Sequence, residues 1–468
     1  MNNVKTNWRW WICSLLFVAT MVNYMDRQVL SLTWKDFIAP EFGWTSGDYG
    51  LITGFFSLAY AFISLFAGRF IDWMGTRRGY LIAIFVWSLG ACLHAACGWG
   101  ALRVASLMTL TAGTVSVYMF LFCRFVLALG EAGNFPAAIK VTAEYFPRKD
   151  RALATSIFNA GASIGALLAP ASIPYLARLF GWEMAFIIIG ALGFVWMGFW
   201  VAMYDKPEQS RHVNEAELAY IRQDDSDNST SEPTPQVKHS EEPAIPFLRC
   251  FCYRQTWSFI AGKFFTDGVW WFFLFWAPAY FSDQYGYRSD SPQAVMLIFV
   301  LYLIVTLLSI GGGYLPKYFV EKRGMEAYAG RMRAMLLFAF FPLTALLAQP
   351  LGVYSAWFPA VIIGLAGAGH QSWSANLYST IGDMFPKSTV ATITGIGTMA
   401  GGIASFAINW GSGLFFDFAE ARGSQFSFAG FEGKEASYMI VFCLCAVGYL
   451  VAWTVMKSLV PRFQKITA

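Results

Sequence analysis

Stretches of about 20 mostly apolar residues recur along the whole chain, and each is long enough to cross the hydrocarbon core of a bilayer as a helix. Of the 468 residues, 57% are hydrophobic and only 13% are charged, whereas a soluble domain carries roughly 25% charged residues. The sequence therefore predicts an all-α membrane protein. Twelve spans are expected, at residues 10–32, 48–71, 79–98, 112–140, 151–176, 183–204, 255–281, 293–316, 331–349, 353–382, 390–416 and 437–459.

Lys and Arg are unevenly distributed between the loops that join these spans, and positively charged loops stay on the cytoplasmic side of a membrane. Most basic residues lie in the termini, the long central loop and alternate short loops, so we expect both termini to be cytoplasmic, in an inner or plasma membrane. The net charge of +4 reflects this bias and contact with anionic lipid rather than binding to nucleic acid. The opposite side holds Lys35, Arg103, Arg178, Arg288, Arg422 and Lys434, and the apolar runs hold Arg27, Arg124 and Lys263.

A polar central segment divides the twelve spans into six and six. Within it, EAELAYIRQ has helical periodicity, while DDSDNSTSEPTPQVKHSEEP cannot bury enough apolar surface to fold. We expect an N-terminal six-helix half at 1–204, a cytoplasmic linker at 205–250 and a C-terminal six-helix half at 251–468. The eight Cys lie in apolar runs or beside this loop, and their spacing indicates neither disulfides nor a metal site.

The two halves repeat each other at a constant offset. The segment GEAGNFPAAIKVTAEYFPRKD, from Gly130, aligns with GHQSWSANLYSTIGDMFPKST, from Gly369, and in this register Glu131 falls opposite His370. Parallel six-helix repeats with a substrate site between them are the plan of major facilitator transporters. The repeat therefore indicates polar residues that face one site from two sides.

Charged residues inside a spanning helix are costly, at least about 2.5 kcal/mol at the bilayer centre, so they need a reason. The stretch NYMDRQVL places Asp26 and Arg27 in the first span, and CRFVLALGEAGNFP places Arg124 and Glu131 in the fourth. Arg124 and Glu131 are close to two helical turns apart, so they share a face with a rise of about 10 Å. A static ion pair that braces two helices needs one acid and one base, whereas this half has two of each.

Two acids and two bases can exchange partners, as coupling of an anion to a proton requires. An anion that binds an Arg removes the counter-charge of a neighbouring carboxylate, which then takes up a proton more readily. Arg is suited to hold such an anion, because its planar guanidinium group can donate two parallel hydrogen bonds to one carboxylate. The residues therefore predict an anion and proton symporter, with a static brace as the alternative.

The loop GRFIDWMGTRR, between the second and third spans, pairs acid and base across a tight turn that contains glycine. It resembles the loop signature of the major facilitator superfamily, although an ordinary charged turn is the simpler interpretation of the same residues. The resemblance implies a conformational latch whose pairs break and reform as the halves rock. Its residues would be Gly68, Asp72, Gly75, Arg77 and Arg78.

Together, NYMDRQVL and RFVLALGEAGNFPAA resemble the anion:cation symporter branch of that superfamily, which includes bacterial sugar-acid transporters and vesicular glutamate carriers. The resemblance implies that Asp26 and Glu131 are the protonation sites and that Arg27 holds the substrate carboxylate. Arg124 would link them. The resemblance covers the whole chain apart from the linker and the residues near 423–436, and it implies that the protein lies in a bacterial inner membrane.

The C-terminal half is most similar to hexuronate transporters, through GKFFTDGVWWFFLFWAPAYF, from Gly262, and GHQSWSANLYSTIGDMFP, from Gly369. Trp faces stack on sugar rings, and Asn, Gln, His and Ser satisfy hydroxyl groups. The further candidates for substrate binding are Tyr24, Tyr60, Lys263, His370, Gln371, Trp373 and Asn376.

Several of these residues have simpler interpretations. Trp270, Trp271 and Trp276 suit packing against lipid equally well. Lys263 near a helix end suits snorkelling to the surface, or else it pairs with Asp267 one turn along. His370 would also serve as a neutral core residue.

The sequence thus predicts a proton-driven secondary transporter that imports a hexuronate, galacturonate or glucuronate, by alternating access. The alternative within this class is another sugar acid, such as the aldonate galactonate, or a small organic anion. An enzyme would need a catalytic constellation or a sizeable extramembrane domain, and a channel would not need charged pairs inside one half. We expect a monomer without cofactor or metal, whose partners are the substrate anion, protons and lipid.

Overall fold

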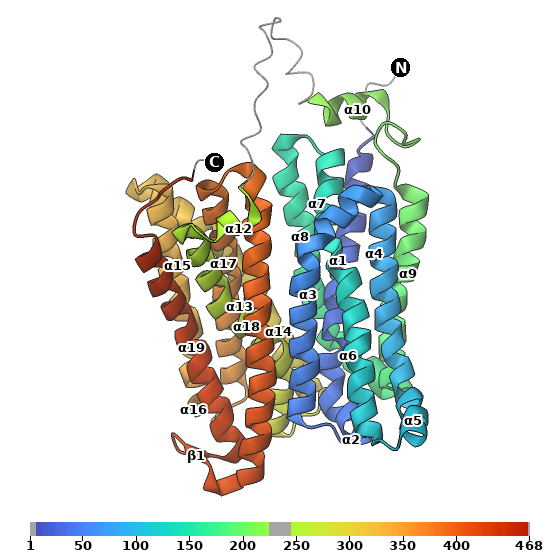
Figure 1. The fold of residues 1–468 in the computed structure, drawn as a ribbon, viewed down its shortest axis with the longest axis vertical. Coiled ribbons are helices and arrows are strands. Elements are labelled where there is room, and N and C mark those ends of the chain that lie inside the picture. Colours follow the sequence, from blue (N-terminus) through green and yellow to red (C-terminus); the bar gives the residue numbers. More distant parts are fainter. Residues whose placement is uncertain (1–5, 224–244, 467–468) are drawn as a thin grey trace, which may run out of the picture.

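In a computed structural model, the protein is an all-α molecule of two helical bundles that lie side by side. The structure describes residues 6–223 and 245–466. Figure 1 shows the N-terminal half in blue to green and the C-terminal half in yellow-green to red. We call the end at which the short helices α10 (Glu215–Ile221) and α12 (Phe247–Cys250) lie the linker end, and the other the far end.

The N-terminal half contains the long helices of the first six spans. It consists of α1 (Trp8–Thr33), which continues as the π-helix η1 (Trp34–Ile38), α2 (Ala39–Phe42), α3 (Ser46–Met74), α4 (Thr76–Leu93), η2 (His94–Ala96), α5 (Cys97–Met108), α6 (Ala112–Glu131), α7 (Asn134–Tyr145), α8 (Arg148–Phe180) and α9 (Trp182–Met203).

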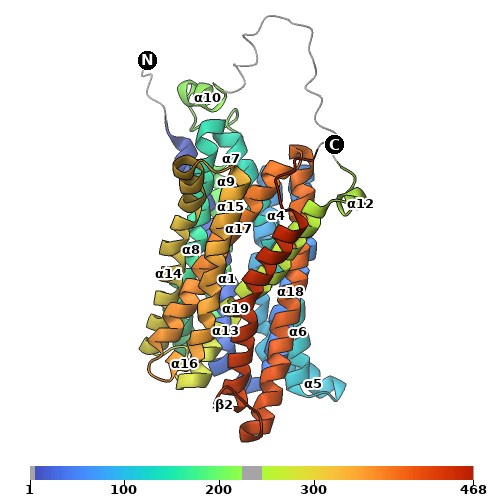
Figure 2. The same ribbon diagram turned by 90° about the vertical axis from the view of Figure 1, so that its left-hand side faces the viewer.

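The C-terminal half repeats this plan. It consists of α13 (Arg254–Tyr285), α14 (Pro292–Arg323), α15 (Ala327–Leu343), η3 (Thr344–Leu347), α16 (Ala348–Gly352), α17 (Trp357–Met384), α18 (Lys387–Arg422), η4 (Gly423–Gln425), the antiparallel strands β1 (Ser427–Phe428) and β2 (Phe431–Glu432), and α19 (Gly433–Leu459). Figure 2 shows this hairpin at the far end.

Every expected span coincides with a long helix or a run of helices, so the prediction of an all-α fold with two six-helix halves is confirmed. Within the described residues, nine segments are long and apolar enough to cross a membrane by length and composition alone. The remaining long helices are α1, α13 and α17. These three carry charged or polar residues that the sequence singles out, such as Asp26, Lys263 and His370.

Equivalent glycines mark the internal repeat in three dimensions. A Cβ atom at Gly130 of α6 would lie 2.2 Å from the backbone nitrogen of Trp87 in α4, and one at Gly369 of α17 would lie 3.0 Å from the backbone oxygen of Phe338 in α15. Both glycines therefore let the same pair of helices approach closely in each half. After each of these segments a proline caps the next long helix, at Pro147 and Pro386.

The two halves meet mainly where α3 packs against α18, and also where α8 meets α14 and α1 meets α13. Glycines allow the α3 and α18 backbones to touch: a Cβ at Gly50 would lie 2.4 Å from the backbone oxygen of Asn409, and one at Gly413 would lie 2.3 Å from that of Ser46. The halves are thus in backbone contact near the far end.

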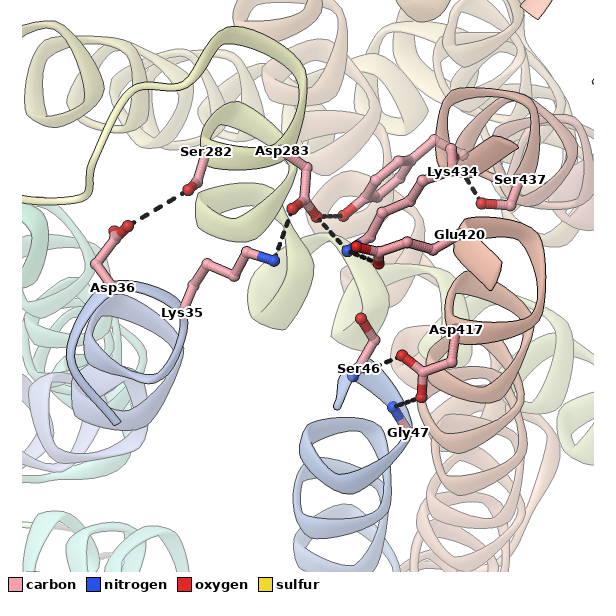
Figure 3. Close-up of polar contacts among 11 residues, drawn as sticks. Lys35, Asp36, Ser46, Gly47, Ser282, Asp283, Asp417, Glu420, Lys434 and Ser437 are labelled. Atoms are coloured by element: carbon pink, nitrogen blue, oxygen red, sulfur yellow. Dashed lines mark hydrogen bonds and ion pairs between the residues drawn. The ribbon is translucent and has the colours of Figure 1, made fainter. Parts of the chain in front are cut away.

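Polar contacts across the halves are concentrated at the far end. We call them the far-end lock, which joins Lys35, Asp36, Ser46 and Gly47 to Ser282, Asp283, Ser289 and Asp417. Figure 3 shows these contacts apart from that of Ser289. The Lys35 Nζ lies 2.8 Å from Asp283 Oδ1, and the backbone amide of Ser289 donates to Asp36 Oδ2 over 2.7 Å. These contacts hold the far end closed.

An aromatic layer lies beneath the far-end lock. Trp34 and Tyr49 stack with ring centroids 4.1 Å apart, and both meet Trp276 of the other half edge-on. The Tyr49 hydroxyl also donates to the backbone oxygen of Phe275 over 2.7 Å. The layer joins η1 and α3 to α13 between the lock and the charged residues described next.

Candidate functional site

Arg27 of α1 and Glu131 of α6 form a buried ion pair. The Arg27 Nε and Nη2 atoms donate to the same oxygen, Glu131 Oε2, over 3.0 and 2.7 Å. Both side chains are buried, with 6% and 0% of their surface exposed. The fourth-span acid that the sequence singles out is therefore the partner of the first-span Arg.

Four aromatic rings surround the Arg27 guanidinium. Its Cζ atom lies 5.1 Å from the ring centroid of Tyr24, 5.7 Å from Phe56, 4.9 Å from Tyr60 and 5.1 Å from Trp271. Such contacts attract a cation to the ring faces. Tyr24 and Tyr60 are among the predicted substrate contacts, whereas Phe56 is not. Trp271, for which lipid packing is an equal alternative, reaches Arg27 from the opposite half.

Asp26 and Arg124 lie buried next to this pair, with 2% and 1% of their surface exposed. Among the described residues, neither oxygen of the Asp26 carboxylate, nor Nε or Nη1 of Arg124, forms a hydrogen bond of normal geometry, although the Trp87 side chain lies beside Asp26. Arg124 interacts electrostatically with both Asp26 and Glu131, and its Cζ lies 5.3 Å from the Phe56 ring centroid. Because buried charges normally need hydrogen-bonded partners, this arrangement leaves Asp26 and Arg124 able to take new ones.

The C-terminal half has a charged pair of its own. Lys263 Nζ lies 2.6 Å from Asp267 Oδ2, one turn along α13, and donates to the Tyr378 hydroxyl of α17 over 3.0 Å. The side chains of Lys263 and Asp267 are only 6% and 12% exposed. Lys263 therefore does not snorkel to the surface, and the alternative pairing with Asp267 is the one that the structure contains.

His370 of α17 is held by neighbours on two other helices, α13 and α19. Its Nδ1 atom lies 2.7 Å from the Tyr449 hydroxyl of α19, which in turn donates to the backbone oxygen of Thr266 in α13 over 3.2 Å. Trp270 stacks on the imidazole with centroids 5.2 Å apart and planes 3° apart. When the Tyr449 hydroxyl donates to Thr266, Nδ1 of His370 must carry the hydrogen that it shares with Tyr449, and Nε2 is then an acceptor.

The other candidates of α17 lie around His370 but not beside Arg27. Trp373 is fully buried and meets Tyr449 edge-on, with centroids 5.6 Å apart. Asn376 donates to the backbone oxygens of Gly312 and Ser372 over 3.2 and 2.8 Å, which ties α17 to α14. Gln371 is half-buried and makes no hydrogen bond within the described part of the chain.

The loop between α3 and α4 forms its contacts with the N-terminal half and with the first residue of the linker. Gly75 has φ +77°, a conformation that favours glycine. Asp72 pairs with Lys140 of α7 over 2.8 Å, and Arg77 pairs with Asp205 over 2.5 Å.

Further contacts support this loop. The Thr76 hydroxyl donates to Glu144 Oε1 over 2.5 Å, and the Tyr204 hydroxyl donates to Glu144 Oε2. The expected latch residues Gly68 and Arg78 lie at the same end, where Arg78 is exposed and a Cβ at Gly68 would meet open space. The sequence analysis did not identify Glu144 as a latch residue. Its position in the internal repeat was a possible signal, because it aligns with Asp383, another acid at the same end of the molecule. In the C-terminal half, Asp383 pairs with Arg331.

No group of His, Cys, Asp and Glu residues suited to hold a metal ion occurs in the parts of the chain that the structure describes. The site is instead a set of paired and unpaired charges among aromatic rings.

Comparisons with known proteins bear on the family and the fold of this chain. Residues 16–408 match the Major Facilitator Superfamily model. The chain is similar to a hexuronate transporter of Escherichia coli strain K12, with 28% identity over 96% of this chain and 94% of that protein. It is also similar to a probable galactarate/D-glucarate transporter of the same organism, with 25% identity over 85% of this chain and 86% of that protein.

A solved structure with a similar fold is that of a bacterial homolog of the human lysosomal transporter Spinster, in an inward-facing and unoccupied conformation. The TM-score is 0.70 at 16% identity, and the similarity covers 96% of this chain and 97% of that one. The family model extends over most of the chain and both halves show the same repeated plan. This chain belongs to the major facilitator superfamily.

Proposed function

We propose that the protein is a proton-coupled secondary transporter that imports a sugar acid, with the hexuronates galacturonate and glucuronate as the principal substrates. The alternative is a symporter for another sugar acid, such as galactonate, or for a small organic anion. Similarity to transporters named for hexuronate and for galactarate and glucarate supports the sugar-acid class.

The observation that carries this proposal is the Arg27–Glu131 pair inside its aromatic cage. A substrate carboxylate has the same shape and charge as the Glu131 carboxylate and would compete with it for the Arg27 fork. Once displaced, Glu131 would be a buried carboxylate without its counter-charge and would take up a proton. Substrate binding and protonation would then occur together, with Tyr24, Tyr60 and Trp271 stacked about the substrate.

Asp26 and Arg124 provide a second exchangeable pair in the same half. Arg124 interacts with Asp26 and with Glu131, so it would transmit the change of charge at one carboxylate to the other. Asp26 and Glu131 are the proposed protonation sites. Lys263, His370, Gln371, Trp373 and Asn376 are the proposed contacts for the rest of the substrate.

The distribution of contacts supports alternating access. The far-end lock joins the two halves at one end. At the linker end, Asp72 pairs with Lys140 of the same half and Arg77 pairs with Asp205 at the start of the linker. If the linker end is cytoplasmic, as the positions of Lys and Arg favour, this is an inward-facing state. Residues 1–204 and 251–468 would rock as two bodies joined by the linker 205–250, with both termini in the cytoplasm of a bacterial cell and no need for a second copy.

The proposal is tested with purified protein in liposomes. Uptake of labelled galacturonate is measured with and without an inward proton gradient, in competition with glucuronate, galactonate and glutamate. Uptake that is driven by the gradient and blocked only by uronates supports both the coupling and the substrate class. Block by galactonate or glutamate instead would retain a symporter but overturn the hexuronate assignment, and the absence of any sugar-acid uptake would overturn the proposed function.

A further inference from the structure

Lys263, Asp267 and Trp271 form one stripe on α13, because residues four apart lie on the same helix face. Trp271, at one end of the stripe, touches Arg27 of the opposite half. Asp267 lies one turn from Trp271, a rise of about 6 Å, which is within the length of a six-carbon sugar acid. A sugar acid whose carboxylate is held by Arg27 is therefore long enough to reach the Lys263–Asp267 pair with its other end.

This pair has no net charge, because the 2.6 Å contact joins one ammonium and one carboxylate. It offers both a donor and an acceptor: Lys263 has three N–H donors, of which Asp267 and Tyr378 use two, and the Asp267 carboxylate has oxygen lone pairs beyond the one that Lys263 uses. Such a pair is complementary to a hydroxyl group, which both donates and accepts. It is not complementary to a second carboxylate, which Asp267 would repel.

The position of Asp267 is fixed by the neighbouring helix. A Cβ atom at Gly401 of α18 would lie 2.3 Å from Asp267 Oδ2, so the carboxylate packs directly against that glycine. The contacts with Lys263 and Gly401 hold the carboxylate between α13 and α18. Because it is held there, its negative charge stays close to the Lys263 ammonium.

From these contacts we infer that Asp267 is a specificity-determining residue. It neutralises Lys263 and so selects sugar acids with one carboxylate and a distal hydroxyl, such as hexuronates and aldonates, over aldarates with a carboxylate at each end. This inference rests on the proposed function, because it concerns which sugar acids the same site accepts.

The test compares galacturonate with galactarate, two six-carbon sugar acids that differ in having one carboxylate or two. The affinity ratio is measured by competition for binding to the purified wild-type protein and to Asp267→Asn, which keeps the shape of the side chain but removes its charge. The variant leaves Lys263 with an unneutralised charge, so the ratio is expected to shift toward galactarate by about tenfold or more. An unchanged ratio, or a shift toward galacturonate, would overturn the inference.

Lys263→Gln is the matched variant with the opposite expectation. At a pH high enough to keep Asp267 ionised without its counter-charge, it leaves Asp267 as an unpaired negative charge, so discrimination against galactarate should increase. Under the same conditions the double variant Lys263→Gln/Asp267→Asn should return to the wild-type ratio within a few-fold. If Asp267→Asn does not fold, the discrimination against galactarate in Lys263→Gln decides the test alone. Discrimination equal to that of the wild type would then overturn the inference.

A wild-type protein that binds neither sugar acid overturns the proposed function, and the inference with it. A wild-type protein that binds galacturonate while all variants keep its ratio overturns the inference alone.

Discussion

Asp417 of α18 accepts a hydrogen bond of 2.7 Å from the backbone amide of Gly47, in the first turn of α3 on the opposite half. The other carboxylate oxygen accepts from the amide of Ser46 over 2.8 Å, so both oxygens are used (Figure 3). The first amides of a helix lack partners within the helix and carry partial positive charge. One carboxylate of the C-terminal half thus caps a helix of the N-terminal half, and the cap exists only while the far end is closed.

Replacing Asp417 should therefore favour opening of the far end. Asp417→Asn keeps one acceptor oxygen and loses the charge and the second acceptor, which costs about 1.5–3 kcal/mol for a charge-assisted hydrogen bond, or roughly tenfold or more in population. Distances between spin labels at the far ends of α3 and α18, measured by electron paramagnetic resonance in liposomes, should show an increased long-distance population.

Asp383→Asn provides the control for this experiment. Asp383 is also an acid of the C-terminal half, but it pairs with Arg331 of the same half. Its replacement should leave the far-end distances unchanged. Equal distance distributions in Asp417→Asn and the wild type would show that the cap does not hold the far end closed.

The glycines of α18 allow a second prediction about closure. A Cβ at Gly413 would lie 2.3 Å from the backbone oxygen of Ser46, whereas at Gly411, two residues earlier, nothing lies within 4 Å. Gly413→Ala should therefore force α3 and α18 apart, at a cost of about 1–3 kcal/mol for an overpacked contact, and slow uptake. Gly411→Ala should transport at the wild-type rate. Similar uptake by the two variants would show that this backbone contact is not needed for the transport cycle.

Much of the fold and part of the N-terminal site could be predicted from the sequence. Long apolar runs determine spanning helices, and a charge such as Arg27 or Glu131 inside such a run stands out because burial makes it costly. The pairing of Arg27 with Glu131 rather than with Asp26 could not be predicted. The spacing of residues in the sequence tells which of them share a face of one helix, but not how that helix is rotated relative to its neighbour. The site roles themselves stay predictions.

Other parts of the structure left no recognisable signal in the sequence. Phe56 is one of 44 Phe residues in an aromatic-rich chain, so its place beside Arg27 could not be distinguished from lipid packing. Asp417 near the end of a long helix suits any solvated helix end, and its partners are backbone amides, which every sequence has. Contacts between the halves depend on the conformational state, which a periodic pattern does not specify.

The proposed protonation sites lead to a third prediction. Asp26→Asn and Glu131→Gln each remove a group that can exchange a proton, so accumulation of galacturonate against a gradient should be lost while exchange of internal for external substrate continues. A gradient of one pH unit supplies about 1.4 kcal/mol per proton, or about tenfold accumulation, and the variants should approach simple equilibration. Uptake in liposomes, with exchange measured in the absence of a proton gradient, checks this. Undiminished gradient-driven uptake by both variants would remove the coupling proposal.

The last prediction separates the charge of Arg27 from its shape. Arg27→Ala should abolish binding, but it also leaves Glu131 buried without a partner, which destabilises a protein by about 3–5 kcal/mol. Arg27→Lys is more informative, because it keeps the positive charge and loses the planar fork whose Nε and Nη2 both reach Glu131. Its affinity for galacturonate should fall roughly tenfold to a hundredfold, as expected for loss of one charge-assisted hydrogen bond of about 1.5–3 kcal/mol.

Calorimetric titration of the purified protein with galacturonate measures this loss, and the unfolding temperature of each variant without ligand shows whether the fold is kept. Arg331→Lys is the matched control, since Arg331 pairs with Asp383 at the linker end and is remote from the aromatic cage. It should bind galacturonate as the wild type does. If Arg27→Lys also binds with wild-type affinity, a positive charge alone suffices at this position, and the bidentate clamp that the Glu131 contacts suggest is not how the substrate is held.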